Sequence, residues 1–155
     1  MIFVECDNDE ALLRGLGIPR AKFDHHAGKP RVAKALQTTT STGSIGIVDQ
    51  DPGAIPPPYL TEFRVADDQP SLGLRRLKHR KDDKWLIEIQ PDLEPWIYQM
   101  AKAASIAPID NHLPERHSVL HDYPKTYEKR LVTFISTLHS QGNPRLATLA
   151  RWLSA

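Results

Sequence analysis

The chain has 155 residues, of which 20 are lysine or arginine and 19 are aspartate or glutamate, giving a formal net charge of +1. This length suits one domain with a substantial core, and the balanced charge excludes a general attraction to polyanions, so any contact with nucleic acid must come from a local patch. A single cysteine, Cys6, excludes an internal disulfide. No secretory leader and no apolar run of roughly 20 residues is recognisable, which predicts a cytoplasmic protein without a membrane partner.

The first third of the sequence alternates between strand and helix patterns. Residues 2–5 and 45–48 are apolar and β-rich, and residues 20–24 have a weaker strand pattern. Between these segments, apolar residues recur with helical spacing after Asp7 and again after Gly28. A β-α-β-α-β alternation over about 50 residues predicts a parallel sheet with right-handed crossovers.

The next third changes character after a proline-rich loop that begins at Pro52. Residues 61–66 are a further strand candidate, and residues 73–79 and 84–89 have the alternating pattern of a β-hairpin. This hairpin is expected to extend the edge of the sheet.

The last third is helical. Apolar residues follow helical spacing after Pro91 and again over 127–138 and 144–153, whereas 106–123 is expected to be an irregular connection. We therefore predict a single three-layer α/β domain with a mainly parallel central sheet, an edge hairpin and C-terminal helices. Its expected parts are a core over residues 1–66, the edge hairpin over 67–90 and a helical extension over 91–155.

Three carboxylates follow two of the predicted strands. Glu5 closes the first strand, and Asp49 and Asp51 close the third. In open α/β sheets, ligands gather outside the carboxyl ends of the strands, and side chains two residues apart on an extended chain project to the same side. Hard cations such as Mg²⁺ and Mn²⁺ prefer carboxylate oxygens, and like charges brought together without a cation raise one another's pKa. The pattern predicts a divalent-metal site; the alternative is a polar Asp-Pro-Gly turn.

The same residues carry a family resemblance. The run Ile2-Phe3-Val4-Glu5, followed by the strand and helix patterns above and by Ile45-Gly46-Ile47-Val48-Asp49-Gln50-Asp51, resembles the topoisomerase–primase (Toprim) domain over roughly residues 1–66. Within that family it is most similar to small stand-alone proteins and to the overcoming-lysogenization-defect nucleases, with Cys6 where the family usually has glycine. The resemblance implies a Toprim/Rossmann-like fold and Mg²⁺-dependent cleavage or transfer of phosphodiesters. It also implies that Glu5 is a general acid/base or metal ligand and that Asp49 and Asp51 are metal ligands.

Further residues are candidates for the same site. Asp9 and Glu94 are possible additional ligands, although each also suits a helix N-terminus, where negative charge is favourable. Lys29 could stabilise a phosphate oxyanion if its loop faces the acids, and is otherwise a solvated lysine.

The predicted hairpin is rich in cations, with Arg75, Arg76, Lys78 and Arg80 as candidate nucleic-acid contacts. Local arrays of this kind bind phosphate backbones. Lysine-rich edges also prevent unwanted strand pairing, so a solvated edge is an equal alternative.

Two other motifs point more weakly to chemistry. His117 and His121 have the spacing of a metal pair on a helix, and His25 and His26 follow the second predicted strand, but no residue completes a zinc signature. Cys6 beside the first carboxylate could be a nucleophile, and a small buried thiol is the simpler interpretation.

Three hypotheses of function remain. The first is a metal-dependent nuclease or phosphotransferase acting on nucleic-acid phosphodiesters, with Mg²⁺ or Mn²⁺ as cofactor. The second is a non-catalytic binding or regulatory subunit of a defence or DNA-processing complex, with a protein partner. The third, a small-molecule α/β enzyme, has no cofactor motif to support it.

Overall fold

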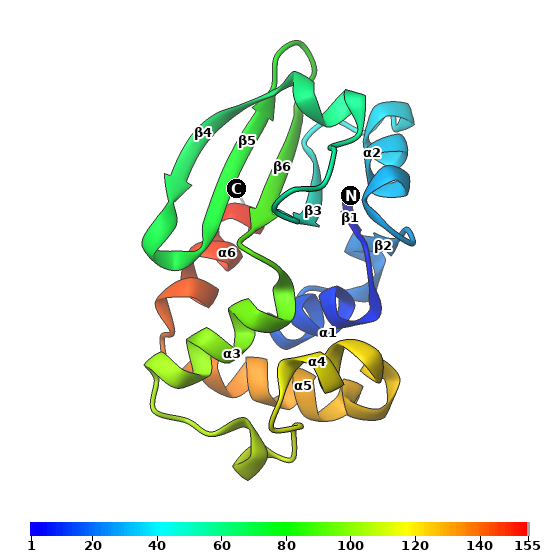
Figure 1. Ribbon diagram of the computed structural model, residues 1–155. Coiled ribbons are helices and arrows are strands. Elements are labelled where there is room, and N and C mark those ends of the chain that lie inside the picture. Colours follow the sequence, from blue (N-terminus) through cyan, green and yellow to red (C-terminus); the bar gives the residue numbers. More distant parts are fainter. Residues whose placement is uncertain (155) are drawn as a thin grey trace.

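The computed structural model describes residues 1–154 as one six-stranded sheet with helices on both faces (Figure 1). The strands are β1 (Ile2–Val4), β2 (Phe23–His25), β3 (Ser44–Asp49), β4 (Phe63–Gln69), β5 (Leu74–His79) and β6 (Lys84–Ile89). The α-helices are α1 (Asp7–Gly15), α2 (Lys29–Thr38), α3 (Leu93–Ala103), α4 (His117–Asp122), α5 (Pro124–Ser140) and α6 (Pro144–Ser154). None of the helices in this part of the chain is long and apolar enough to cross a membrane.

The strand order is β2-β1-β3-β6-β5-β4. In this order, β2, β1 and β3 each pair in parallel with the next strand. Strand β5 then pairs antiparallel with β6, and β4 pairs antiparallel with β5. The predicted α/β class with a mainly parallel sheet is therefore confirmed. The weaker second strand begins later than expected, at Phe23, because residues 20–22 form a 3-10 turn.

The hairpin is present, but it does not form the edge. Strand β6 pairs in parallel with β3, from Ser44 opposite Lys84 to Asp49 opposite Ile89, so it lies inside the sheet. The edge strand on this side of the sheet is β4, which runs through residue 66, the expected limit of the core. The prediction of an edge hairpin is wrong because the alternating pattern of a hairpin does not reveal which of its strands finds an outside partner. As a result, β6 ends beside the end of β3.

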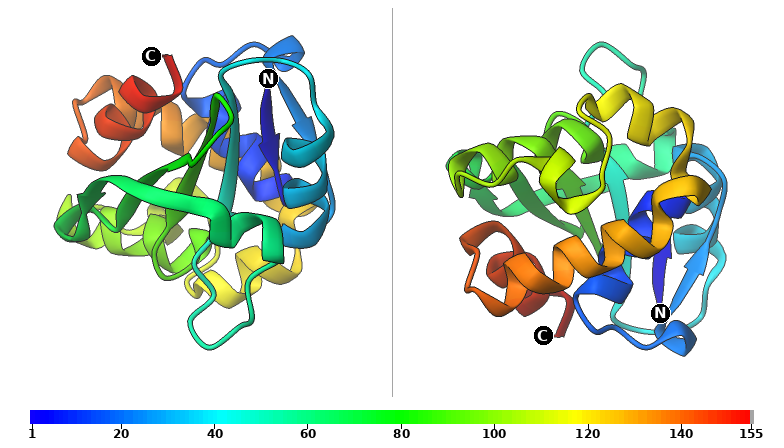
Figure 2. Two further views of the ribbon diagram at one scale, coloured as in Figure 1. Left: turned by 90° about the horizontal axis from the view of Figure 1, so that it is seen from above. Right: turned by 90° about the horizontal axis from the view of Figure 1, so that it is seen from below.

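Each face of the sheet is covered by its own hydrophobic cluster. One contains buried residues from α1, α3, α5 and α6 and includes the fully buried Trp96. The other contains α2 and the 3-10 turn Pro58–Glu62. Figure 2 shows the C-terminal helices, in orange and red, on the side of the sheet away from α2. Gly46 of β3 allows α2 to approach, because an added Cβ would lie 2.6 Å from a methyl carbon of Leu36.

The segment 106–123, expected to be irregular, contains a 3-10 turn over Pro108–Asn111 and the six-residue helix α4. Helix α4 packs against α3 and α5 at the same end of the sheet as α1 (Figure 1). This position brings α4 close to the residues that follow β3 and β6.

Candidate metal centre

Strands β1, β3 and β6 run in parallel, so their carboxyl ends lie at the same end of the sheet. Asp49 is the last residue of β3, Asp51 follows it, and Asp92 follows β6. One carboxylate oxygen from each of these three residues lies within 4.8 Å of the other two. We call these three residues the aspartate cluster. Such a set of oxygen donors fits a hard divalent cation.

Asp49 and Asp51 come together in a different way from the one expected. The extended backbone that strand alternation requires does not continue to Asp51, which has φ of 49° in the left-handed region. Aspartate tolerates this conformation better than most residues. The Asp51 N–H donates to Pro91 O at 3.3 Å, so the turn is held against the connection between β6 and α3. The turn, and not strand alternation, therefore places Asp51 beside Asp92.

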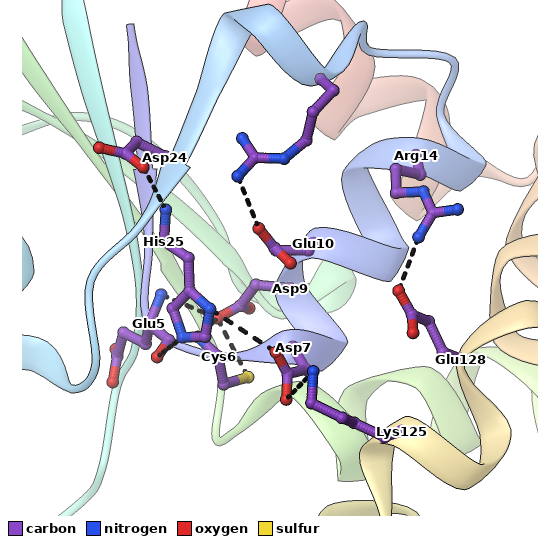
Figure 3. Close-up of polar contacts among 11 residues, drawn as sticks. Glu5, Cys6, Asp7, Asp9, Glu10, Arg14, Asp24, His25, Lys125 and Glu128 are labelled. Atoms are coloured by element: carbon purple, nitrogen blue, oxygen red, sulfur yellow. Dashed lines mark hydrogen bonds and ion pairs between the residues drawn. The ribbon is translucent and has the colours of Figure 1, made fainter.

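Glu5 lies next to the aspartate cluster but outside the group of three oxygens. Its Oε1 accepts a hydrogen bond from the Asp49 N–H at 2.9 Å, which joins the ends of β1 and β3. Asp9 lies behind it, where Oδ2 accepts from the backbone N–H groups of Glu5 at 3.1 Å and Cys6 at 3.0 Å (Figure 3). Asp9 thus has the capping role that was its alternative reading, and its carboxylate is held close to Glu5.

Burial and mutual repulsion make the carboxyl end of these strands unfavourable for negative charge. Burial, followed by the charges of Asp9 and Glu5, raises the pKa of Asp49 to about 9. Burial and the charge of Glu5 raise the pKa of Asp9 to about 7. Burial also raises the pKa of Glu5, and burial with neighbouring Asp51 raises that of Asp92. Carboxyl groups crowded in this way gain most from a bound cation.

One cation contacts the cluster directly. The Lys29 Nζ lies 3.2 Å from Asp51 Oδ2 and donates to Gln50 O at 3.3 Å, and its side chain is only 14% exposed. The structure therefore brings Lys29 to the acids, as its functional interpretation requires, and it is not a solvated lysine.

The aspartate cluster opens into a cavity of about 280 Å³. The lining residues are Asp49, Asp51, Asp92, Glu94, Pro95, His117, Ser118, His121 and Asp122. Asp92 Oδ1 is shielded from solvent and has no hydrogen-bond partner. Asp49 Oδ1, by contrast, accepts from the Leu93 N–H at 3.0 Å. A buried carboxylate oxygen without a partner is an available ligand atom, so the residues present fit a divalent ion.

Asp92 is the residue that sequence reasoning missed as a ligand. Asp92 directly precedes α3, where negative charge is favourable at the helix N-terminus, but its side chain makes no cap hydrogen bond to that helix. Its signal was an acidic residue just after a strand. That signal becomes informative only when β6 is known to run parallel to β3.

Glu94 is nearly fully buried, with 4% of its surface exposed. Its Oε1 accepts from Asn8 Nδ2 at 2.9 Å and lies 3.4 Å from His121 Nδ1. The carboxylate therefore joins α3 to α1 and α4, and it stands beside the aspartate cluster without belonging to its three oxygens.

The candidate nucleic-acid residues lie on β5 and in the turn after it, do not line this cavity, and in several cases have local partners. Arg75 pairs with Glu88 at 2.7 Å, while the Arg76 guanidinium and the Lys78 ammonium lie 3.9 and 4.4 Å from the centre of the Trp85 ring. Arg80 is exposed in the turn after β5. The neighbouring Lys84 is buried, and its Nζ donates to Leu36 O at the end of α2.

Strand register separates the far end of this hairpin from the acids. Lys78 pairs with Trp85, and Trp85 pairs with Ile45 near the start of β3. Asp49 ends the same strand, about 13 Å away at about 3.3 Å per residue. The turn between β5 and β6 and the carboxyl ends of β3 and β6 are at opposite ends of the sheet in Figure 1.

The remaining candidates form a second polar group around the start of α1 (Figure 3). Possible ligand atoms of Asp7, Glu10 and His25 lie within 4.8 Å of one another, and Lys125 and Arg20 lie 3.7 and 3.6 Å from Asp7 and Glu10. His25 Nε2 lies 3.0 Å from Glu5 O.

Cys6 has the extended backbone that any residue adopts, with φ of −148°, so a side chain at this position causes no strain. Its Sγ donates to Asp9 Oδ2 at 3.3 Å. Burial and the charge of Asp9 raise the pKa of the Cys6 thiol well above its usual range, which favours an inert thiol over a nucleophile.

The sequence matches no protein-family model and no curated protein, and the fold matches no solved structure. The geometry of this site therefore carries the functional argument.

Proposed function

We propose that the protein is a divalent-metal-dependent nuclease or phosphotransferase that acts on nucleic-acid phosphodiesters in the cytoplasm. The observation that carries this proposal is the aspartate cluster, whose three oxygens lie within 4.8 Å of one another at the ends of parallel strands. The proposal takes residues 1–66 as the core of a Toprim-like fold. Mg²⁺ or Mn²⁺ is the expected ion because both prefer oxygen ligands and remain open to a phosphate oxygen.

The residues around the cluster have distinct tasks in this proposal. Asp49, Asp51 and Asp92 would hold the ion, which supplies Lewis-acid stabilisation of a phosphoryl oxygen and a more acidic bound water. Lys29 places a positive charge beside Asp51, where it can stabilise charge on a phosphoryl group. Burial raises the pKa of Glu5 above its ordinary value, a direction that suits a group that exchanges protons with the reactants.

Calorimetric titration with Mn²⁺, combined with cleavage of single- and double-stranded DNA and RNA, tests the proposal. We expect the wild-type protein to bind Mn²⁺ and to cleave at least one of these substrates. Asp49→Ala should weaken Mn²⁺ binding by more than about 100-fold, because loss of even a residue that only supports a ligand costs about 10–100-fold. Glu5→Ala should lower cleavage.

The matched control is Asp68→Ala, which removes an exposed aspartate from the edge strand β4. It should leave both Mn²⁺ binding and cleavage unchanged. A folded wild-type protein that neither binds Mn²⁺ nor cleaves these substrates would refute the proposal.

A non-catalytic binding or regulatory subunit is the second candidate. The observation that favours it is structural: Glu5 accepts the Asp49 N–H, and Asp49 accepts the Leu93 N–H, so both carboxylates also hold the fold together. This function predicts that Glu5→Gln and Asp49→Asn leave partner binding intact. Cleavage abolished by either substitution would exclude it.

A further inference from the structure

Helix α4 forms the wall of the cavity opposite the aspartate cluster. Four of its six residues line the cavity: His117, Ser118, His121 and Asp122. Residues three and four apart on a helix lie on one face, so this spacing turns a single polar face towards the acids. Two imidazoles and a hydroxyl group on that face can donate hydrogen bonds.

His121 is the best oriented of these donors. Its Nδ1 lies 3.4 Å from Oε1 of the buried Glu94, and Asn8 Nδ2 holds the same oxygen at 2.9 Å. Asn8 also donates to Leu120 O at 3.2 Å, which fixes the backbone next to His121. The imidazole itself is 71% exposed. Because a carboxylate only accepts hydrogen bonds, Nδ1 is the donor to Glu94, and Nε2 is left for a ligand.

His117 has a different environment. Its ring meets Tyr98 edge to face, with ring centroids 5.9 Å apart. This contact gives His117 a packing role, whereas His121 has a polar anchor on one ring nitrogen and access to the cavity on the other.

We propose that His121, with Ser118 beside it, binds the non-bridging oxygens of the phosphoryl group whose other oxygens face the aspartate cluster. This inference rests on the proposed function. A phosphoryl group that meets a cation on one side has oxygens on its far side that need donors, and α4 supplies them there. When the His121 imidazole carries a proton on both nitrogens, Nδ1 donates to Glu94 and Nε2 donates to the phosphate, and both hydrogen bonds are charge-assisted.

The cavity also limits what α4 recognises. Its volume of about 280 Å³ is at the lower end of small-molecule sites. Asp122 lies on the same face of α4 and would repel a second phosphate. The recognised unit is therefore one phosphoryl group with its immediate neighbour, such as a strand end or a flexible single strand, and not the surface of a duplex.

Hydrolysis of bis(p-nitrophenyl) phosphate in the presence of Mn²⁺ tests this inference, because this small diester presents one phosphoryl group. His121→Ala should raise KM by about 10–100-fold, the value of a hydrogen bond to a charged group. The same substitution should weaken competitive inhibition by inorganic phosphate to a similar extent, leave kcat less affected and leave the affinity for Mn²⁺ unchanged. Ser118→Ala should raise KM severalfold, and His121→Gln, which keeps a donor, should recover part of the loss.

His139→Asn, near the far end of α5, is the control for loss of an imidazole and should match the wild type. Unchanged KM and phosphate inhibition in His121→Ala, with Mn²⁺ binding and cleavage intact, would overturn this inference alone. A parallel loss of Mn²⁺ affinity in His121→Ala would overturn it too, because the histidine would then act on the ion. Failure of the wild type to bind Mn²⁺ or to cleave the diester would overturn the proposed function and this inference together.

Discussion

The two ends of the central sheet differ in how their charged side chains are paired. At the hairpin-turn end, cations that look available in the sequence have local partners: Lys78 pairs with Asp83, and buried Lys84 donates to Leu36 O at the end of α2. At the other end, Asp49, Asp51 and Asp92 crowd together, and burial and repulsion raise the pKa of Asp49 to about 9. The difference teaches that the number of charges in a segment says less about function than how many of them the fold pairs with an opposite charge: Lys29 pairs with Asp51, and no ion pair to Asp49 or Asp92 is present in the described part of the chain.

Substitution of Lys29 is expected to have the largest effect, because it removes the positive charge that contacts the aspartate cluster at Asp51. Lys29→Met should slow phosphodiester cleavage by about 10–100-fold, since a positive charge near the phosphoryl group is lost. The same change should tighten Mn²⁺ binding, because Asp51 loses its ion pair. Cleavage rates and calorimetric titration measure the two effects. A substitution that leaves both unchanged would show that Lys29 does not act on the cluster.

The pH dependence of stability provides a second test. A carboxyl group whose pKa is raised by folding binds its proton more tightly in the folded protein, so the stability it contributes is lost as the pH rises through its folded pKa. For Asp49 this window extends from its ordinary 3.8 to about 9, and for Asp9 from 3.8 to about 7. The free energy of unfolding of the metal-free protein should therefore fall from about pH 5 to about pH 9.

The variant Asp49→Asn separates this effect from general alkaline unfolding. At pH 8 it should raise the melting temperature of the metal-free protein by about 2–4 °C, equivalent to about 1 kcal/mol. Mn²⁺ should stabilise the wild type at this pH but not the variant. A metal-free wild type that is more stable at pH 8 than at pH 5, measured by denaturant unfolding, would contradict the assigned repulsion.

The smallest expected effect is at the hairpin end. Arg76→Ala should lower the free energy of unfolding by about 0.5–1 kcal/mol, because the guanidinium no longer covers the Trp85 ring. Mn²⁺ affinity and cleavage of the small diester should not change. Loss of DNA or RNA binding in this variant, measured at more than one salt concentration, would break the comparison by showing that the hairpin contacts nucleic acid.

Local sequence patterns are sufficient for the first three parallel strands and for part of the site. The apolar run before Asp49 predicted a strand buried on both faces, and β3 is buried from Ser44 to Val48. Helical spacing predicted α1 and α2, whose N-termini bring Asp9 and Lys29 towards the acids. These features depend on neighbours along the chain, so the sequence shows them directly.

The missing parts depend on long-range pairing. Asp92 joins the cluster because β6 pairs with β3, and no local pattern distinguishes that pairing from an edge position. The left-handed backbone of Asp51 is fixed by a contact with Pro91. The face that α4 turns to the cavity likewise depends on Glu94 and Asn8, which are distant in the sequence.

The place of β6 also bears on how the molecule folds. The first two members of the aspartate cluster are present once β3 has joined β1, but the third arrives only after the chain has passed through β4 and β5 and returned to the middle of the sheet. Such non-local pairing forms slowly, because a long loop must close before its contacts can stabilise it. A partly folded chain in which β6 has not yet joined β3 would therefore have only two of the three aspartates in place, and a cation that binds all three would favour the fully assembled sheet.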